Sequence, residues 1–317
     1  MDIMSIKALA DGFRANISRV IVGKTEVIDK VLAALLAGGH VLLEDVPGTG
    51  KTLLSRALSK SMDAQFSRIQ FTPDLLPGDV TGMAVFSPKT AEFTFKQGPV
   101  FANVVLADEI NRATPRAQSS MLECMEEKQV SSDGVTYKLP APFFVIATQN
   151  PVETQGTFPL PEAQLDRYMV KLSMGYPTVE EQAQILQRFM NDSPQEALTP
   201  VATAAEVLEA QQAIKSVRVH PELLAYIGAI CEKTRQRDDA LLGASPRAAL
   251  ALMRVSQAYA AINGRDYVTP EDIKEMAESV LAHRMILRTA YGQRGRAAEA
   301  VKEVLGSVRV PTEVTDK

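Results

Sequence analysis

The chain contains few of the residues that build disulfide frameworks or metal clusters. Its 317 residues include two cysteines, Cys124 and Cys231, and three histidines, His40, His220 and His283. The cysteines lie far apart and neither has a neighbouring metal-ligating residue, so the sequence indicates neither a disulfide framework nor a zinc site. We expect both cysteines to be small apolar core residues. The histidines form no cluster, and we expect each to have a structural role.

Long hydrophobic runs and an excess of positive charge are also missing. The longest apolar stretch, residues 31–43, contains Gly38, Gly39 and His40 and is too short to span a bilayer. The N-terminal residues lack the pattern of a signal peptide, so we expect a cytoplasmic protein without a membrane span. The formal net charge of −4 gives no overall basic field, and nucleic acid is therefore not expected as a partner.

Short apolar runs alternate with helical patterns in the first part of the chain. Runs of this length are typical of strands that are buried on both faces. Their alternation with helices favours an α/β fold around a five-stranded, mostly parallel sheet. The predicted strands cover residues 40–44, 66–71, 103–107, 143–148 and 167–172.

Two segments break this alternation. Residues 82–96 contain two strand-like runs around a turn at Ser87-Pro88-Lys89-Thr90, and residues 129–139 contain an Asp133-Gly134 turn. Turn residues between short β-patterned runs are typical of hairpins. We predict two β-hairpins inserted into the α/β core.

Helical signals dominate after residue 177. Thr178 and Thr203 each begin a capping box, and Thr269-Pro270 places a proline in a first helical turn. Polar residues and Pro194 interrupt the helices between residues 191 and 200. We therefore predict an α/β domain over residues 1–195 and an all-helical domain over residues 196–317.

Gly48-Thr49-Gly50-Lys51-Thr52 follows an apolar strand pattern and precedes a helical one. Such a loop cradles phosphates with its N–H groups and the helix N-terminus, while the lysine reaches the β- and γ-phosphates and the hydroxyl binds Mg²⁺. The sequence therefore predicts an ATP-type nucleotide with Mg²⁺ as cofactors, in a site completed by Pro47 and Leu53. Asp45 stands where the standard pattern has glycine, and its side chain could either cap the turn or face solvent.

Two more predicted strands end in polar residues. Asp108 and Glu109 follow the run 103–107, as in a Walker B element, so we assign Asp108 to the metal and Glu109 to the general base. As an isolated pair they would be read as the acidic start of a solvated helix. Asn150 follows the run 143–148 and is predicted to contact the attacking water or the γ-phosphate; its alternative role is to form a turn before Pro151.

Taken together and in order, these motifs resemble those of the AAA+ ATPases, and specifically the MoxR family. The resemblance covers nearly the whole chain and rests on Val22-Gly23, residues 47–52, residues 108–113, residues 147–151, residues 161–167 and residues 243–247. It implies an ATP-binding core, a helical lid and a homo-oligomeric ring, usually of six subunits. The two predicted hairpins resemble the extra elements of the branch that includes magnesium chelatase and the MCM helicases.

The resemblance also assigns roles to residues that spacing alone does not identify. It implies that Arg167 is an arginine finger for a neighbouring subunit, that Arg247 is the sensor 2 arginine of the lid, and that Val22 and Gly23 contact adenine. From the residues alone, both arginines would be surface ion-pair partners. Arg112 is equally compatible with a subunit interface and with a solvated helix face.

The most favoured function is ATP-driven remodelling of client protein complexes, which the resemblance associates with partners that contain a von Willebrand A domain. The alternatives are a magnesium-chelatase-like motor subunit and a nucleic-acid motor related to the MCM helicases. A GTPase is disfavoured because the sequence has no Asn-Lys-x-Asp guanine-reading segment.

Overall fold

The computed structural model describes the whole chain except residues 90, 152–155, 191–197, 289–295 and 312–317. A five-stranded sheet lies at its centre, with the strand order β2-β5-β8-β1-β9. Every neighbouring pair is parallel, which confirms the predicted α/β sheet. Its strands are β1 (Val41–Glu44), β2 (Phe66–Gln70), β5 (Val104–Asp108), β8 (Phe144–Gln149) and β9 (Val170–Leu172).

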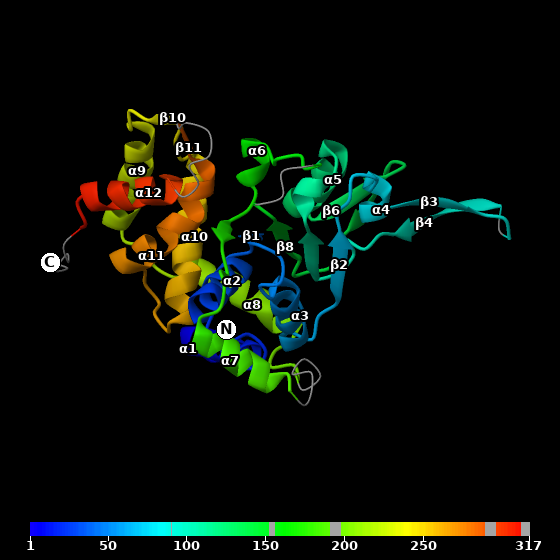
Figure 1. The fold of residues 1–317 in the computed structure, drawn as a ribbon, viewed down its shortest axis with the longest axis horizontal. Helices are drawn as coiled ribbons and strands as arrows, with labels where there is room; N and C mark the ends of the chain where they lie inside the picture. The colour runs from blue at the N-terminus through cyan, green and yellow to red at the C-terminus, as the bar shows by residue number, and fades with distance from the viewer. Residues whose placement is uncertain (90, 152–155, 191–197, 289–295, 312–317) are drawn as a thin grey trace.

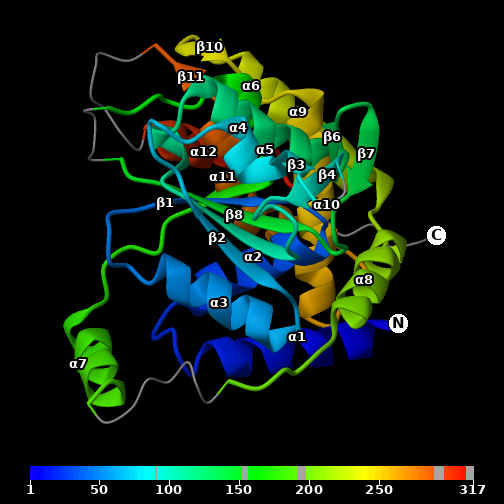
Figure 2. The same cartoon turned by 90° about the vertical axis from the view of Figure 1, so that its right-hand side faces the viewer.

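Helices cover both faces of this sheet, as the apolar runs predict. Residues of one strand alternate between two hydrophobic clusters: Val41 and Leu43 belong to the first, and Leu42 belongs to the second. The first cluster includes α1 (Ile3–Ile17), α2 (Thr25–Leu36) and α3 (Lys51–Ser61). The second includes buried residues of α4 (Pro77–Thr81) and α5 (Pro115–Glu127) on the opposite face (Figure 2).

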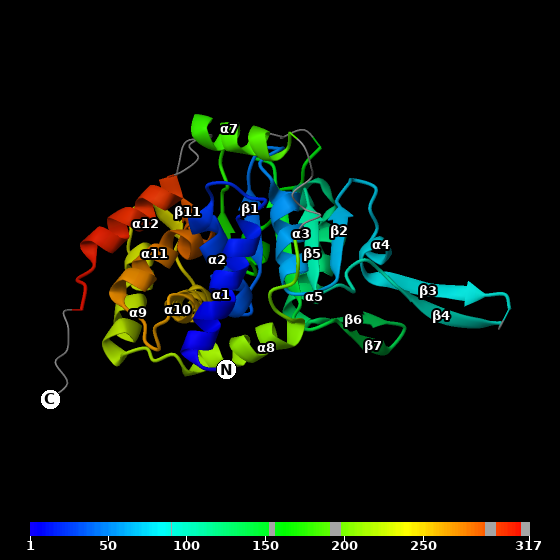
Figure 3. The same cartoon turned by 90° about the horizontal axis from the view of Figure 1, so that it is seen from below.

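Both predicted hairpins are present. Strands β3 (Gly82–Ser87) and β4 (Glu92–Gln97) pair antiparallel, as do β6 (Gln129–Ser132) and β7 (Val135–Lys138). Asp133 and Gly134 adopt φ angles of 51° and 79°, the left-handed conformation that a tight hairpin turn requires. The β3–β4 hairpin projects far from the body of the molecule (Figures 1 and 3). Residue 90, in the other predicted turn, lies outside the described residues.

Within the residues that the structure describes, the C-terminal part is helical apart from one short strand pair and an isolated β-bridge between Arg218 and Tyr267. Its helices are α7 (Val179–Arg188), α8 (Ala204–Ala213), α9 (Pro221–Arg235), α10 (Pro246–Ile262), α11 (Pro270–Leu281) and α12 (Arg296–Ser307). Thr178 and Thr203 cap their helices and Pro270 lies in the first turn of α11, as predicted, and Thr269 also caps its helix. The strands β10 (Ala240–Leu242) and β11 (Ile286–Leu287) pair antiparallel. Each is too short to have a strand pattern in the sequence. Among the described residues, no helix combines the length and apolarity needed to cross a membrane.

The first hydrophobic cluster runs through both ends of the chain. It contains Phe13 of α1 and Leu32 of α2 together with Leu252 and Val255 of α10, all of which are fully buried or nearly so. In Figure 1, α10 stands directly beside α2 and α1. The predicted domain boundary at residue 195 lies in the range 191–197, outside the described residues, and stays a prediction.

Candidate active site

A cavity of about 440 Å³ lies at the carboxyl ends of β1, β5 and β8. In an open parallel sheet this edge is the usual place for a ligand. The cavity brings together nine of the residues predicted from sequence and three that were not predicted. The predicted ones are Pro47, Gly48, Gly50, Lys51, Thr52, Leu53, Asp108, Glu109 and Asn150; the others are Arg56, Arg68 and Gln70.

The Gly-rich loop connects β1 to α3. Gly48 and Gly50 have φ angles of 84° and 91°, which side chains other than glycine rarely adopt. Helix α3 begins at Lys51, so its unpaired N–H groups point toward the cavity. The Lys51 ammonium donates to the carbonyls of Asp45 and Val46, at 2.8 and 3.3 Å. Partial burial lowers the pKa of Lys51, and the nearby acids oppose this shift.

The structure supports neither of the two alternatives for Asp45. Its side chain is buried and neither faces solvent nor caps its own loop. The carboxylate accepts hydrogen bonds from the Ser173 hydroxyl at 2.8 Å and from the backbone N–H groups of Met174 and Gly175 at 2.5 and 3.0 Å. Asp45 therefore ties the start of the loop to the segment that follows β9.

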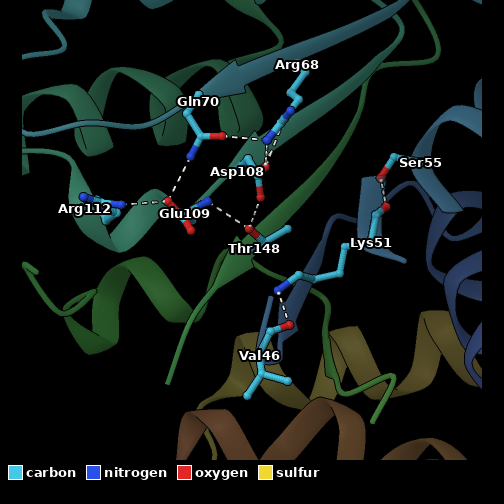
Figure 4. A network of polar contacts seen from close by, with 9 residues as sticks. All are labelled: Val46, Lys51, Ser55, Arg68, Gln70, Asp108, Glu109, Arg112 and Thr148. Atoms are coloured by element: carbon cyan, nitrogen blue, oxygen red, sulfur yellow. Dashed lines mark hydrogen bonds and ion pairs between the residues drawn. The ribbon is translucent and has the colours of Figure 1, made fainter. Parts of the chain in front are cut away.

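The acid pair lies at the end of β5, beside Thr148 of β8 (Figure 4). Thr148 donates its hydroxyl to Asp108 Oδ1 at 2.6 Å and accepts the Glu109 backbone N–H at 2.8 Å. Glu109 adopts a left-handed backbone with φ 55° and ψ 49°. Glu109 is followed by the short 3₁₀ helix Ile110–Arg112, but Asp108 is buried and both acids line the cavity, so the pair is not the start of a solvated helix.

Arg167 and Arg247 do not line this cavity. Arg167 precedes β9 and donates to Glu126 Oε2 at 2.9 Å, and Arg247 at the start of α10 donates to Glu126 Oε1 at 2.6 Å. All three border a separate cavity of about 360 Å³, together with Arg254 and Arg284. The structure thus brings the two arginines together, but away from the phosphate loop.

Val22 and Gly23 also lie outside the residues that line the phosphate-loop cavity. Val22 is buried, and Gly23 has a φ angle of 69°. A Cβ atom added to Gly23 would lie 1.7 Å from Glu181 Oε1 of α7. The positive φ, together with the close approach of the Glu181 side chain, favours glycine at this position.

Comparisons with known proteins agree with this geometry. A model of the "ATPase family associated with various cellular activities (AAA)" matches residues 40–170, and a model of the AAA lid domain matches residues 232–304. The chain is 51% identical over 299 residues to the uncharacterized protein YeaC of Bacillus subtilis, covering 94% of this chain and 93% of the relative. It is 42% identical over 306 residues to Chaperone MoxR1 of Mycobacterium tuberculosis, covering 93% and 81%. The chain belongs to the MoxR family of AAA ATPases.

A solved structure supports the same fold. The crystal structure of a proposed ATPase from Cytophaga hutchinsonii superposes with a TM-score of 0.88 at 40% identity, over 98% of this chain and 97% of that one. The expected family is therefore confirmed, and membership of it implies that the MoxR-type chain binds nucleotide.

This MoxR-type site offers oxygen ligands that suit a magnesium ion. Thr52 offers a hydroxyl and Asp108 a carboxylate, and hard oxygen donors are what Mg²⁺ prefers. Within the part of the chain that the structure describes, no three or more His, Cys, Asp and Glu side chains form a metal cluster. Mg²⁺ commonly takes one or two ligands from the protein and the rest from substrate phosphates and water.

Sequence reasoning missed the polar residues of β2. Arg68 donates to Asp108 Oδ2 from Nε at 3.0 Å and from Nη2 at 2.6 Å. Gln70 accepts from Arg68 at 2.7 Å and donates to Glu109 Oε2 at 2.9 Å. The sequence does contain one signal for these residues, the alternation of polar and apolar side chains along a strand. Arg68 and Gln70 flank buried Ile69 and therefore share one side of β2 (Figure 4).

Arg112 belongs to the same polar network. Its Nη1 lies 3.2 Å from Glu109 Oε2, within the turn that follows the acid pair. In this chain, the arginine therefore contacts the predicted base of its own site, whether or not it also faces another subunit.

Proposed function

We propose that this MoxR-family chain hydrolyses ATP with Mg²⁺ in a homo-oligomeric, hexameric ring, and uses the turnover to assemble, activate or mature client protein complexes. The observation that carries this proposal is the convergence of the phosphate loop, Asp108, Glu109 and Asn150 on one cavity. A triphosphate, a metal and an attacking water need these groups within reach of one another.

The binding roles follow from the loop. The N–H groups of residues 48–52 and the start of α3 would hold phosphate oxygens, and Lys51 would contact the β- and γ-phosphates. Thr52 and Asp108 would hold Mg²⁺, whose charge offsets the negative charge that develops on the phosphate oxygens. Thr148 orients Asp108 through its hydroxyl.

Glu109 is proposed as the general base. Its carboxylate lies at the cavity and is oriented by Gln70 and Arg112, which both contact Oε2. A base held in this way can accept a proton from a water aligned with the γ-phosphate, and Asn150 at the same rim can hydrogen-bond that water.

Arg167 and Arg247 are proposed to complete the site of a neighbouring subunit. They lie together at a cavity other than the one that contains the phosphate loop, so a ring is needed to bring them to a nucleotide. Stabilisation of transition-state charge by such a finger contributes roughly 10³- to 10⁵-fold in related phosphoryl transfers.

Client remodelling is supported by the name of Chaperone MoxR1 and by the surface of the β3–β4 hairpin. Phe86 and Phe93 are 48% and 73% exposed, with ring centroids 5.3 Å apart. Exposed apolar side chains on a projecting element suit contact with another protein. A partner with a von Willebrand A domain and a cytoplasmic location are part of the proposal.

The test of hydrolysis is Glu109→Gln, which removes the base and nearly preserves the shape of the side chain. We expect steady-state ATP turnover to fall by about 10²-fold or more, while the affinity for a fluorescent ATP analogue changes little. Lys51→Ala is the matched variant, because it should weaken nucleotide binding itself. Normal turnover by Glu109→Gln would refute the assignment of the base.

The test of remodelling uses the same Glu109→Gln chain as an affinity bait with ATP. A client protein complex should be retained with ATP and released with ADP, and Lys51→Ala should not retain it. Equal recovery by both variants would count against ATP-dependent capture of clients.

A further inference from the structure

The ion pair between Arg68 and Asp108 lies at the carboxylate assigned to the metal. The two residues come from neighbouring parallel strands, with Gln70 opposite Asp108 in the register. The Arg68 side chain is 45% exposed and that of Asp108 is 12% exposed. The pair therefore lies at the wall of the cavity, where an ion that enters with the nucleotide can reach it.

The hydrogen bonds of Asp108 leave little capacity for another cation. A carboxylate offers about four lone-pair positions. Arg68 takes two of them at Oδ2, and the Thr148 hydroxyl takes one at Oδ1. Because Thr148 also binds the Glu109 backbone, Oδ1 is held in place and Oδ2 is the oxygen that can change partners.

A magnesium ion at Asp108 would compete with Arg68 for that oxygen. Mg²⁺, or a water in its first shell, needs a lone pair of the carboxylate, and a guanidinium within hydrogen-bond distance repels the ion. Arg68 can move away at low cost because nearly half of its side chain is already in solvent.

We propose that Arg68 is a positioning residue that exchanges with Mg²⁺ at Asp108 when the metal–nucleotide complex binds. The inference rests on the proposed function, since it takes Asp108 as the metal-facing acid. In this arrangement the positive charge of Arg68 offsets the charge of the Asp108 carboxylate and keeps it correctly oriented. Arg68 also reduces the gain in nucleotide affinity that Mg²⁺ provides.

The test is the ratio of the affinities for a fluorescent ADP analogue in excess Mg²⁺ and in excess EDTA. In Arg68→Gln the competitor is removed, and we expect Mg²⁺ to strengthen binding by about 2- to 5-fold more than in the wild-type chain, as for a partly exposed ion pair. Arg68→Lys keeps one charge without the two-pronged contact and should give an intermediate ratio.

Arg56→Gln is the matched control. Arg56 lines the same cavity but lies over the Phe66 ring, 5.7 Å from its centroid, and has no hydrogen bond to Asp108. Its loss should weaken nucleotide binding equally with and without Mg²⁺. Melting temperatures of the metal-free variants check that each is folded.

If Mg²⁺ strengthened binding of the analogue to folded Arg68→Gln no more than to the wild-type chain, the proposed exchange of Arg68 with Mg²⁺ would be refuted. The proposed ATPase function would be unaffected by this result. If the wild-type chain bound the analogue in neither condition, the proposed function itself would fail, and the inference would fail with it.

Discussion

Arg167 and Arg247 donate to opposite oxygens of a single carboxylate, that of Glu126. Arg167 precedes the edge strand β9, and Arg247 begins α10, so the contact joins the sheet to the helical part of the chain. The two guanidinium groups lower the pKa of the Glu126 carboxyl. We expect the arginines to act as one unit toward a neighbouring nucleotide.

Sharing of sites between subunits can be tested by mixing. Arg167→Ala subunits lack the arginine but keep the phosphate loop, and Lys51→Ala subunits lack the loop lysine but keep Arg167. Because each variant lacks one of the two groups, each should be nearly inactive alone. In mixed rings a Lys51→Ala neighbour supplies the missing arginine, and ATP turnover should recover partly. The measurement is ATPase rate against mixing ratio.

The control replaces Lys51→Ala with the double variant Arg167→Ala/Lys51→Ala, which has no arginine to supply and should rescue nothing. Turnover equal to the sum of the separate variants at every ratio would refute shared sites.

The buried carboxylate of Asp45 should contribute to stability in spite of its place in a glycine position. Asp45→Gly restores the standard loop residue but leaves the N–H groups of Met174 and Gly175 without their acceptor. We expect the free energy of unfolding to fall by roughly 2–4 kcal/mol, measured by urea denaturation. Asp133→Asn, at an exposed turn, is the control and should change little. If Asp45→Gly were as stable as the wild type, these hydrogen bonds would have no net value.

Stability should fall as the pH decreases through the range in which histidine becomes charged. His40 is buried, accepts the Val145 N–H at Nδ1 and bonds the Met125 carbonyl through Nε2, which uses both nitrogens of the neutral ring. Burial lowers its pKa from 6.5 to about 4. As the pH falls, this histidine is therefore protonated in the unfolded chain before it is protonated in the folded chain. The free energy of unfolding should decrease between about pH 6.5 and 4, by up to roughly 3 kcal/mol.

The measurement is the free energy of unfolding in urea at several pH values in this range. His40→Gln cannot titrate, so its unfolding free energy should depend less steeply on pH than that of the wild type. Carboxylates contribute equally to both chains and cancel in the difference. Parallel pH profiles would contradict the assignment to His40.

Both thiols should be inert in the folded protein. Cys124 and Cys231 are buried free cysteines, as the sequence predicts. Burial raises the pKa of Cys124 to about 12 and that of Cys231 to about 11. A thiol-reactive dye should label neither residue in buffer near neutral pH and both in denaturant. Rapid labelling without denaturant would show that one of these regions opens locally.

The parts of the fold that sequence predicts well are those with a local cause. The strands β5 and β8 are apolar over residues 104–107 and 144–147 because both of their faces are covered. The hairpins are marked by their turn residues, and the helix starts by their capping threonines. The phosphate loop and the acid pair follow from such local patterns, since each is fixed within a few residues of one strand end.

The parts that sequence does not predict depend on which elements become neighbours. Arg68 reaches Asp108 only because β2 lies beside β5, and Asp45 meets Ser173 only because β9 lies beside β1. Glu126 of α5 gives no sign that it will meet two arginines from elsewhere in the chain. Pair contacts of this kind appear only after the strand order and the packing of α10 are known.

The apolar seam between α10 and helices α1 and α2 has a mechanical consequence. Swinging the C-terminal helices away from the sheet would uncover side chains such as Leu252 and Val255, which are fully buried against the N-terminal helices. Because burial of each large apolar side chain contributes about 1.5–3 kcal/mol, opening this seam would be costly. We therefore expect the C-terminal helices and the sheet to move as one body, so that in the proposed ring ATP turnover would shift whole protomers relative to one another.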